Sequence, residues 1–420
     1  MRVLMFFVFF LALTLILDTY FYYGIKSIVN KSKYASTIKT IYWSVSGILI
    51  ASYTLAIVLW FLKIPVTGSI KIILQAVSFI LLVPKLLSIS FFLIDDLIRF
   101  FRWGISMFQK PSLPSSQNTG ISRLKFLQLT GLSFFGLFFG LFSYGILRGG
   151  FNYQVKKQKV KLPKLPKGMN GLKIVQISDL HLGSFLSTRP IKEAVRLINE
   201  LEADFVFFTG DLVNDISEEA VDFIPELKKI KAKQGVYSVL GNHDYGDYYY
   251  NKDSPDYLEK KQHNLDLMQK VQKECGWNLM MDENVIFESN GEELAIIGIQ
   301  NWAGTKSFAR YGDLHKAYKG AENAQVKLLL SHDPSHWDVQ VTKEFKEIDL
   351  MFSGHTHGMQ FGIEIPGIKW SPAKYVYPHW AGMYQNKNQS LYVNRGLGFI
   401  GYPGRVGISP EITLFELTNG

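Results

Sequence analysis

Two histidines stand two residues apart in the stretch LMFSGHTHGMQFG, which covers residues 350–362. The whole chain of 420 residues has only nine histidines, so His355 and His357 in one glycine-bounded turn need an explanation. Polar residues also follow four other apolar runs: Asp179 with His181, Asp211, the run Asn242-His243-Asp244, and His332. Imidazole, carboxylate and amide groups are all ligands of divalent metal ions in proteins. The five blocks together are therefore candidates for a metal site.

Each of these blocks comes directly after a short apolar run typical of a buried β-strand. The runs are LKIVQIS, ADFVFFT, GVYSVLG, VKLLLS and IDLMFSG, with LAIIGI as a further strand and RPIKEAVRLINEL and EEAVDFIPELKKIKA as helical stretches. Continuous apolar strands are buried on both faces. We therefore predict an α/β domain, a layered β-sandwich or sheet with outer helices. Because α/β sheets bind ligands at the carboxyl ends of their strands, the five blocks are expected to meet at one edge.

This set of side chains suits two metal ions better than one. A single carboxylate can bridge two ions about 3.5–4 Å apart, which is the spacing in two-metal phosphoesterases. The glycines in the blocks allow sharp turns and bring short side chains close together. The absence of cysteine from all five blocks excludes a structural zinc finger.

The ordered blocks D-x-H, G-D, G-N-H-D, an isolated His and G-H-x-H resemble the calcineurin-like metallophosphoesterase superfamily over residues 171–420. The stretches LYVNRGLG and GRVGISPEI are similar to the tail of membrane-linked members. Those members include enzymes that cleave UDP-2,3-diacylglucosamine. The resemblance implies a hydrolase of phosphate esters that uses two divalent ions, Mn, Zn or Fe.

The resemblance also implies a role for each residue of the blocks. Seven are implied metal ligands: Asp179, His181 and His357 on one ion, Asn242, His332 and His355 on the other, and Asp211 as the bridge. His243 is implied to face the substrate phosphate as general acid or electrostatic stabiliser, with Asp244 orienting it. A hydroxide held between two cations is a nucleophile at neutral pH. One departure is Met359, where many relatives have a second glycine before the glutamine, so the pocket shape beside the site is expected to differ.

Several residues near the blocks are open to a structural interpretation. Asp333 precedes Pro334 and is expected in a turn. His263, His315 and His336 are expected on the surface, whereas His379 in YPHWAG is a candidate pocket residue. The tyrosine-rich segment 244–257 follows the G-N-H-D block and is either a substrate-binding loop or a mobile surface loop.

The charge distribution divides the chain in two. The net charge is +9, but residues 1–169 hold 20 Lys/Arg and 3 Asp/Glu, whereas residues 170–420 hold 25 and 33. The basic part is also the apolar part, which indicates a membrane anchor joined to a mildly acidic globular domain and argues against nucleic acid as a partner. Cys275 is the single cysteine, so the chain forms no internal disulfide and the redox compartment stays open.

Four apolar stretches are long enough to cross a bilayer, at about 3–23, 41–62, 69–94 and 126–147. The third contains Lys85, which is costly in a span unless it faces protein or water. We therefore expect a transmembrane region of about four helices over residues 1–147, a basic Pro/Gly linker over 148–170 and the metallophosphoesterase domain over 171–420. The linker is expected to be a solvated tether that attracts anionic lipids, or to add an edge strand to the domain.

The charges of the loops between the spans bear on which side of the membrane carries the domain. The loops 24–40 and 95–125 carry four and five Lys/Arg, against one in the N-terminal tail and two in 63–71. This distribution favours an extracytoplasmic domain of a cell-membrane protein, although seven Lys/Arg in 148–167 argue the reverse.

The leading interpretation is a membrane-anchored hydrolase of phosphodiesters or pyrophosphates, with a phosphorylated small molecule or lipid as substrate. Proximity to the bilayer favours a lipid-linked substrate. The alternative is a membrane sensor or scaffold that keeps the metal fold without turnover, which the intact Asp211, Asn242 and His243 oppose. A transporter is disfavoured because charges within the spans are few. The sequence leaves the oligomeric state open.

Overall fold

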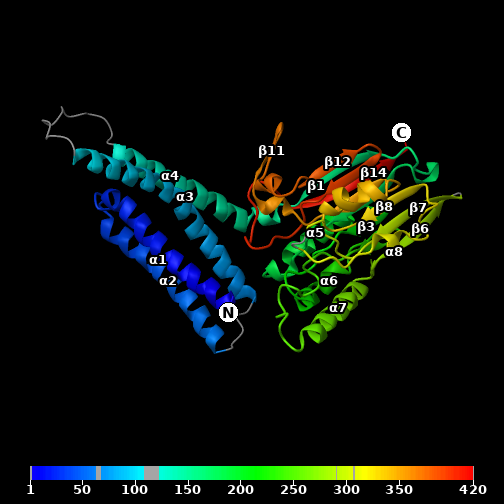
Figure 1. Ribbon diagram of the computed structural model, residues 1–420, viewed down its shortest axis with the longest axis horizontal. Helices are drawn as coiled ribbons and strands as arrows, with labels where there is room; N and C mark the ends of the chain where they lie inside the picture. Colours follow the sequence, from blue (N-terminus) through cyan, green and yellow to red (C-terminus); the bar gives the residue numbers. More distant parts are fainter. Residues whose placement is uncertain (1, 63–67, 108–122, 290, 306–307, 420) are drawn as a thin grey trace. The chain divides into compact units, whose positions relative to one another are not determined.

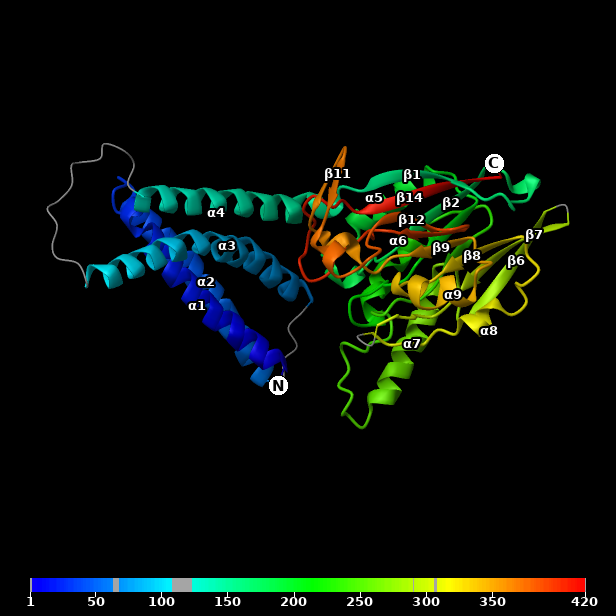
Figure 2. The ribbon, with the colours of Figure 1, turned by 45° about the horizontal axis from the view of Figure 1, so that its top comes forward.

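The computed structural model describes residues 2–62, 68–107, 123–289, 291–305 and 308–419 (Figures 1 and 2). The chain divides into two compact units, Met1–Tyr144 and Gly145–Gly420, called unit 1 and unit 2 below. Parts of two loops that were counted for membrane orientation, 63–67 and 108–122, lie outside the described residues.

Long apolar helices form unit 1, as the sequence predicts. They are α1 (Arg2–Val29), α2 (Ala35–Phe61), α3 (Gly68–Ser106) and α4 (Arg123–Leu147), whose last residues belong to unit 2. Each contains a stretch long and apolar enough to span a membrane. The stretch in α3, Gly68–Ile105, has a mean hydropathy of 2.3 and continues through Pro84. The third predicted span is therefore a single helix.

The charge of Lys85 is neutralised inside unit 1. Its side chain is only 5% exposed, and its ammonium group forms an ion pair with the carboxylate of Asp18 on α1. Ser46 on α2 donates a hydrogen bond to the same carboxylate, and the Tyr42 hydroxyl donates to the Asp18 carbonyl at 2.8 Å. Lys85 thus faces protein, which is the condition under which a lysine is tolerated in a span.

We predict that Lys85→Met destabilises unit 1, because the substitution leaves the Asp18 carboxylate buried and unpaired. Removal of one partner of a buried pair costs about 3–5 kcal/mol. The double variant Asp18→Leu/Lys85→Met removes both charges and is expected to recover most of the loss. The measurement is the melting temperature of the full chain in detergent, with Lys71→Met, at an exposed position of α3, as control. Equal melting of Lys85→Met and Lys71→Met would contradict the prediction.

Unit 2 contains two six-stranded mixed sheets. The first has the order β1 (Gln154–Lys161), β14 (Glu411–Thr418), β2 (Leu172–Ile177), β3 (Phe205–Phe208), β4 (Val236–Ser238), β5 (Trp277–Leu279). The second has the order β12 (Gly382–Asn386), β13 (Gln389–Val393), β9 (Leu350–Ser353), β8 (Val326–Leu330), β7 (Glu292–Gly298), β6 (Glu283–Ser289). A separate antiparallel ribbon is formed by β10 (Ile363–Ile365) and β11 (Ile368–Trp370). The predicted layered α/β class is confirmed.

Apolar side chains point alternately to the two faces of each buried strand, which explains why the sheets stack. Ile174, Phe205 and Phe207 of the first sheet share one core with Leu328 and Phe352 of the second sheet. The Phe207 and Phe352 rings meet edge to face with centroids 5.1 Å apart. Successive side chains of a strand point to opposite faces, so the intervening residues of the same strands face outward. Both faces of each sheet are therefore apolar, as the continuous runs predict.

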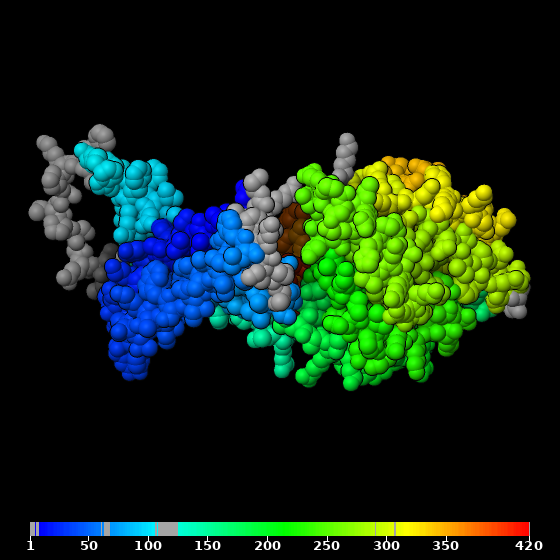
Figure 3. Space-filling model, turned by 90° about the horizontal axis from the view of Figure 1, so that it is seen from below, coloured from blue at the N-terminus to red at the C-terminus, as the bar shows by residue number. Residues whose placement is uncertain are grey.

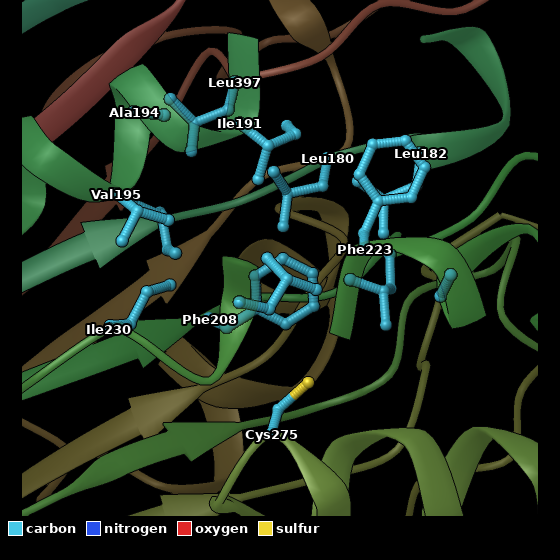
Figure 4. Close-up of a cluster of buried hydrophobic side chains, with 14 of the residues drawn as sticks. Leu180, Leu182, Ile191, Ala194, Val195, Phe208, Phe223, Ile230, Cys275 and Leu397 are labelled. Atoms are coloured by element: carbon cyan, nitrogen blue, oxygen red, sulfur yellow. The ribbon is translucent and has the colours of Figure 1, made fainter. Parts of the chain in front are cut away.

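Helices cover the outer faces of both sheets. The first sheet packs on α5 (Arg189–Asn199), α6 (Ile224–Leu227) and α7 (Tyr257–Glu274), in the core drawn in Figure 4. Figure 3 shows the outer surface of this part of unit 2, in which the segments around α7 are green to yellow-green. The second sheet packs on α8 (Leu314–Tyr318) and on a turn of π-helix, Trp337–Val341, followed by α9 (Thr342–Glu344). Burial raises the pKa of Cys275 to about 12, so this thiol is inert.

Part of the region expected as a linker is folded. Residues Gln154–Lys161 form β1, which pairs in parallel with β14 at the edge of the first sheet. From Lys157 onward, exposed lysines at 157, 159 and 161 alternate with the partly buried Gln158 and the buried Val160. Of the two interpretations that the sequence left open for this segment, the edge strand is the one that the structure shows.

Candidate metal centre

The five sequence blocks follow the carboxyl ends of five strands from both sheets. Strands β2, β3 and β4 are parallel neighbours in the first sheet, and β8 and β9 are parallel neighbours in the second. Parallel strands bring their carboxyl ends to the same edge, and the two edges face one another across the shared core. The structure forms two groups of converging ligand atoms there: Asp179, His181 and His357, and Asp211, His332 and His355.

The backbone is left-handed at five of the seven predicted ligands. The φ angles are 50° at Asp179, 47° at His181, 60° at Asp211, 72° at His355 and 50° at His357. A non-glycine residue pays about 1–2 kcal/mol for this conformation. Strain of this kind clusters at functional sites, where the surrounding structure enforces it. All five residues lie within four residues of the end of β2, β3 or β9, so the strained turns are at the edge where the candidate ligand atoms converge.

In the first group, three side chains point at one another. The Nε2 atoms of His181 and His357 are 3.0 Å apart, and Asp179 Oδ1 lies 3.3 Å from His357 Nε2. His181 Nδ1 lies 3.1 Å from the Val213 carbonyl, which fixes the proton on Nδ1 and leaves the Nε2 lone pair facing the group. Gly354 is required nearby, because a Cβ at that position would overlap Ser178 and Asp179.

The second group is centred on His332. Its Nδ1 donates to the Thr209 carbonyl at 2.7 Å, so its Nε2 faces His355 Nδ1 at 3.3 Å and Asp211 Oδ2 at 3.1 Å. The same Asp211 oxygen is 3.5 Å from His181 Nε2 in the first group. One carboxylate oxygen therefore contacts both groups, as a bridging ligand must.

Asn242 provides a test of whether the site fits a metal ion. Its side-chain nitrogen donates to the Tyr248 hydroxyl at 2.9 Å, but its Oδ1 is buried and accepts no hydrogen bond from the described residues. A buried carbonyl oxygen without a partner is costly unless something outside the protein atoms satisfies it. A divalent ion does so, and imidazole, carboxylate and amide donors suit Mn, Zn or Fe. The residues present therefore fit the implied metals.

Burial sets the protonation of the imidazoles. Burial lowers the pKa of His355 and lowers that of His181 well below its usual range, so both are neutral at pH 7, as ligands must be. Burial also opposes the charged form of His332, but the adjacent Asp211 carboxylate outweighs it and raises the pKa of His332 to about 10. That proton would have to leave for His332 to hold an ion. Despite its burial, Asp179 has its pKa lowered to about 2, mainly by His357.

The expectation that Asp244 orients His243 is wrong. The Asp244 carboxylate accepts backbone N–H groups: Gly241 at 2.8 Å, Asp211 at 3.0 Å, Leu212 at 2.8 Å and Val213 at 3.3 Å. His243 Nδ1 instead bonds to the Asn214 carbonyl at 2.6 Å. Asp244 therefore fixes the strained loop that carries Asp211. Its burial and the nearby Asp211 raise its pKa to about 7, while the backbone donors oppose this shift.

His243 occupies a different position from the candidate ligands. It is half-buried, its backbone N–H donates to Asp211 Oδ1 at 2.9 Å, and its ring meets that of His181 edge to face at 5.0 Å. Because Nδ1 is held by Asn214, Nε2 is the atom left for a substrate. The Tyr248 ring lies 4.6 Å from the His243 ring, so the tyrosine-rich segment does reach the centre.

Asp333, His336 and His379 belong to neither group of candidate ligands. Asp333 accepts hydrogen bonds from Ser335, as a turn residue does, although its second oxygen is 3.8 Å from His355. His336 was expected on the surface, which is wrong: it is fully buried and bonds to Ser331, because the π-helical turn folds over it. His379 bonds to Asp338 at 3.2 Å and is absent from both groups.

Met359 occupies a backbone conformation that favours glycine. Met359 has a φ of 50° and lies between Gly358 and Gln360, which are also left-handed. Glycine adopts this conformation without steric cost, whereas methionine does not. The side chain is 37% exposed, so it extends the surface beside the site rather than filling it.

Two residues beside the centre were not assigned a role from the sequence. The Tyr377 hydroxyl lies 3.5 Å from His355 Nε2. The buried Arg405 places Nη2 3.3 Å from His357 Nδ1 and bonds to the carbonyls of Arg395 and Gly398. Arg405 lies in the stretch GRVGISPEI, whose resemblance to relatives was the only signal available. Its contacts with His357 depend on tertiary structure.

Comparison with known proteins agrees with this architecture. Residues 172–359 match the family described as "Calcineurin-like phosphoesterase", and residues 1–150 match "Probable Calcineurin-like phosphoesterase, transmembrane domain". The chain is 29% identical over 293 residues to the metallophosphoesterase YkuE of Bacillus subtilis, covering 66% of this chain and 94% of YkuE. It is 28% identical over 276 residues to the "Transmembrane protein with metallophosphoesterase domain" of Danio rerio, covering 64% of this chain and 58% of the fish protein.

A helical membrane region followed by an α/β domain with a candidate metal site is the architecture of membrane metallophosphoesterases. Residues 172–359 form a calcineurin-like phosphoesterase domain, a family of hydrolases, and they follow a transmembrane domain of that family in residues 1–150, where four helices are long and apolar enough to span a membrane.

We predict that the purified full chain binds about two divalent ions and that Asp211→Asn lowers this number to one or fewer, since one carboxylate contacts both groups. Elemental analysis after reconstitution with Mn, Zn or Fe is the measurement. Asp338→Asn, on the exposed surface beside His379, is the matched control and should keep both ions. A wild-type content near zero after metal addition would contradict the two-ion site.

We also predict that Asp244→Asn destabilises unit 2 and weakens metal binding, although Asp244 is outside both groups. The amide replaces one acceptor oxygen with a donor that faces backbone N–H groups, a change that costs about 1–3 kcal/mol. Thermal unfolding and a metal titration measure the two effects. Unchanged metal affinity in Asp244→Asn would show that this carboxylate does not hold the Asp211 loop.

Proposed function

We propose that unit 2 hydrolyses a phosphodiester or pyrophosphate bond by means of two divalent ions. In this proposal Asp179, His181 and His357 hold one ion and Asn242, His332 and His355 hold the other, with Asp211 shared. The observation that supports it most is the position of Asp211 Oδ2, 3.1 Å from His332 and 3.5 Å from His181. When bound, two cations supply a nucleophile at neutral pH and neutralise charge on the phosphoryl oxygens.

His243 is proposed to act on the substrate directly. Its Nδ1 is held by the Asn214 carbonyl at 2.6 Å, so Nε2 carries the proton or lone pair that faces the reacting phosphate. From that atom it can donate a proton to the leaving oxygen or stabilise the negative charge of the transition state. Asn214 therefore takes the orienting role that the sequence suggested for Asp244.

The membrane region narrows the proposed substrate class. A domain tethered to the bilayer encounters lipid-linked substrates at high effective concentration. A lipid pyrophosphate such as UDP-2,3-diacylglucosamine is one example. It is suggested by the resemblance of the sequence to membrane-linked members of the family. The charge count of the short loops supports an extracytoplasmic position for the domain.

We predict that His243→Ala lowers kcat by about 10²–10⁴-fold while both ions stay bound, because general acid catalysis typically contributes this factor. The defect should be smaller for nitrophenyl esters, whose leaving groups need no proton. Steady-state kinetics on a poor and a good leaving group, together with metal analysis, measure both effects.

His355→Ala is the control for this experiment and should lose metal, since its Nδ1 faces His332 Nε2 at 3.3 Å. Loss of metal from His243→Ala would mean that His243 is a ligand. Retention of metal with near-normal kcat on the poor leaving group would place the acid elsewhere. Wild-type protein that binds two ions yet hydrolyses no phosphodiester or pyrophosphate would favour the sensor or scaffold alternative.

A further inference from the structure

The ribbon formed by β10 and β11 has one wholly apolar face. Its register pairs Ile363 with Trp370, Glu364 with Lys369 and Ile365 with Ile368. Residues directly opposite each other share a face, and alternate residues along a strand change face. One face therefore carries three isoleucines and the tryptophan, and the other face carries only Glu364 and Lys369.

The polar face of the ribbon is fastened to unit 2. The Glu364 carboxylate accepts from Lys156 Nζ at 2.6 Å and from Arg395 Nη2 at 2.8 Å. Lys369 Nζ donates to the Ala381 carbonyl at 2.6 Å. These contacts from β1, from the end of β13 and from the segment before β12 fix which way the ribbon faces. The apolar face is consequently held outward.

The exposure of that face is large for apolar residues. Ile363 is 49% exposed, Ile365 56%, Ile368 52% and Trp370 38%, and the adjoining Tyr375 and Val376 are 72% and 59% exposed. Figures 1 and 2 show the ribbon projecting from unit 2. Scattered exposed apolar residues are ordinary, but a contiguous patch of this kind marks contact with a membrane or a partner.

The last membrane span indicates which of these it contacts. The base of the ribbon bonds to the segment around Val406: Phe361 bridges to Val406 and Gly407, and Gly362 N donates to the Val406 carbonyl at 2.9 Å. That segment is bonded in turn to the end of α4, since Arg405 N donates to the Gly145 carbonyl at 3.1 Å. The candidate span of α4 extends over Lys125–Phe151. The ribbon is thus fixed, within unit 2, beside the point where the last span ends.

Two further features suit a lipid surface. Trp370 and Tyr375 have the amphipathic rings that are enriched at membrane interfaces, and the Trp370 indole N–H donates to the Tyr375 hydroxyl at 3.4 Å. Arg148, directly after α4, and Lys374, beside Tyr375, are exposed cations suited to anionic headgroups. A second copy of the chain would cover the same apolar area but would not account for the exposed cation Lys374 beside it.

We propose that the apolar face of the β10–β11 ribbon inserts into the interfacial layer of the bilayer that α4 leaves. The segment that follows the ribbon continues into the metal centre, because Tyr377, next to Val376, places its hydroxyl 3.5 Å from His355 Nε2. Resting on the proposed hydrolysis, this arrangement defines the substrate as an amphiphile whose phosphodiester or pyrophosphate lies at the membrane surface. The lipid tail stays in the bilayer while the phosphate reaches the ions.

Depth-dependent fluorescence quenching tests the insertion without any need for turnover. The full chain with Cys275→Ser and Ile365→Cys is labelled with bimane and reconstituted into phosphatidylethanolamine–phosphatidylglycerol vesicles. Quenching by acyl-chain nitroxide lipids is compared with quenching by iodide on both sides of the bilayer. Leu258→Cys is the matched control, because Leu258 is an apolar residue of α7 that is 76% exposed. In Figure 1, α7 and β11 lie on opposite sides of unit 2.

We expect the nitroxide-to-iodide quenching ratio at residue 365 to exceed that at residue 258 by about fivefold or more, as for side chains inserted to a depth of about 5–10 Å. Ile368→Cys should behave as Ile365→Cys does, which guards against a local effect of one substitution. Equal ratios at 365 and 258 would overturn the proposal. Protection at 365 that disappears when the protein is diluted in the vesicles would also overturn it, in favour of a second copy of the chain.

Kinetics on two substrates test the consequence for substrate class. We expect Ile365→Ser/Ile368→Ser to lower kcat/KM about tenfold for CDP-diacylglycerol in vesicles, since two apolar anchors are lost, and to leave bis(p-nitrophenyl) phosphate turnover unchanged. Leu258→Ser is the control. An equal loss on both substrates would overturn the lipid-substrate assignment. If the wild type hydrolyses neither, the proposed function fails, whereas the quenching result still decides the membrane contact.

Discussion

The candidate metal centre depends on the carboxylate of Asp211. One of its oxygens lies within 3.5 Å of an imidazole from each ligand group, and the other accepts the backbone N–H of His243. This position requires a left-handed backbone at Asp211, which is unfavourable for an aspartate. The four backbone N–H groups bound by Asp244 hold the surrounding loops in that conformation. The buried carboxylate of Asp244, which is outside both groups, thus maintains the strained turn that presents the shared carboxylate of Asp211.

The centre also depends on the packing between two sheets. The first sheet carries Asp179, His181, Asp211 and Asn242 after its strands, and the second carries His332, His355 and His357. The distance between the two sheet edges is set by the core between them, where rings such as Phe207 and Phe352 interlock. Protein interiors are close-packed, so a change in this core shifts one set of ligands relative to the other. The stability of the inter-sheet core and the geometry of the site are therefore linked.

Unit 1 and the β10–β11 ribbon of unit 2 follow the same rule. Unit 1 pairs its interior charges, Asp18 with Lys85, and leaves apolar side chains on the outside of the helices. The β10–β11 ribbon does the same on a small scale, since Glu364 is paired with Lys156 and Arg395 while its apolar face is outward. In a medium without water, polar groups must find partners within the protein and apolar groups need none. The ribbon is built by the rule that governs the spans, which is the basis for assigning it to the same membrane.

The sequence alone determined the elements that depend on neighbouring residues. Four apolar stretches predicted the helices, and five apolar runs ending in glycine and polar residues predicted the strands that precede the site, because periodicity and turn chemistry are local. Tertiary structure decided the features whose partners are distant in the chain. Asp244 was assigned to its neighbour His243, yet its carboxylate bonds to Asp211 and Leu212, more than 30 residues away. The burial of His336, the contact of Arg405 with His357 and the outward face of the ribbon likewise follow from packing between segments, which no local pattern encodes.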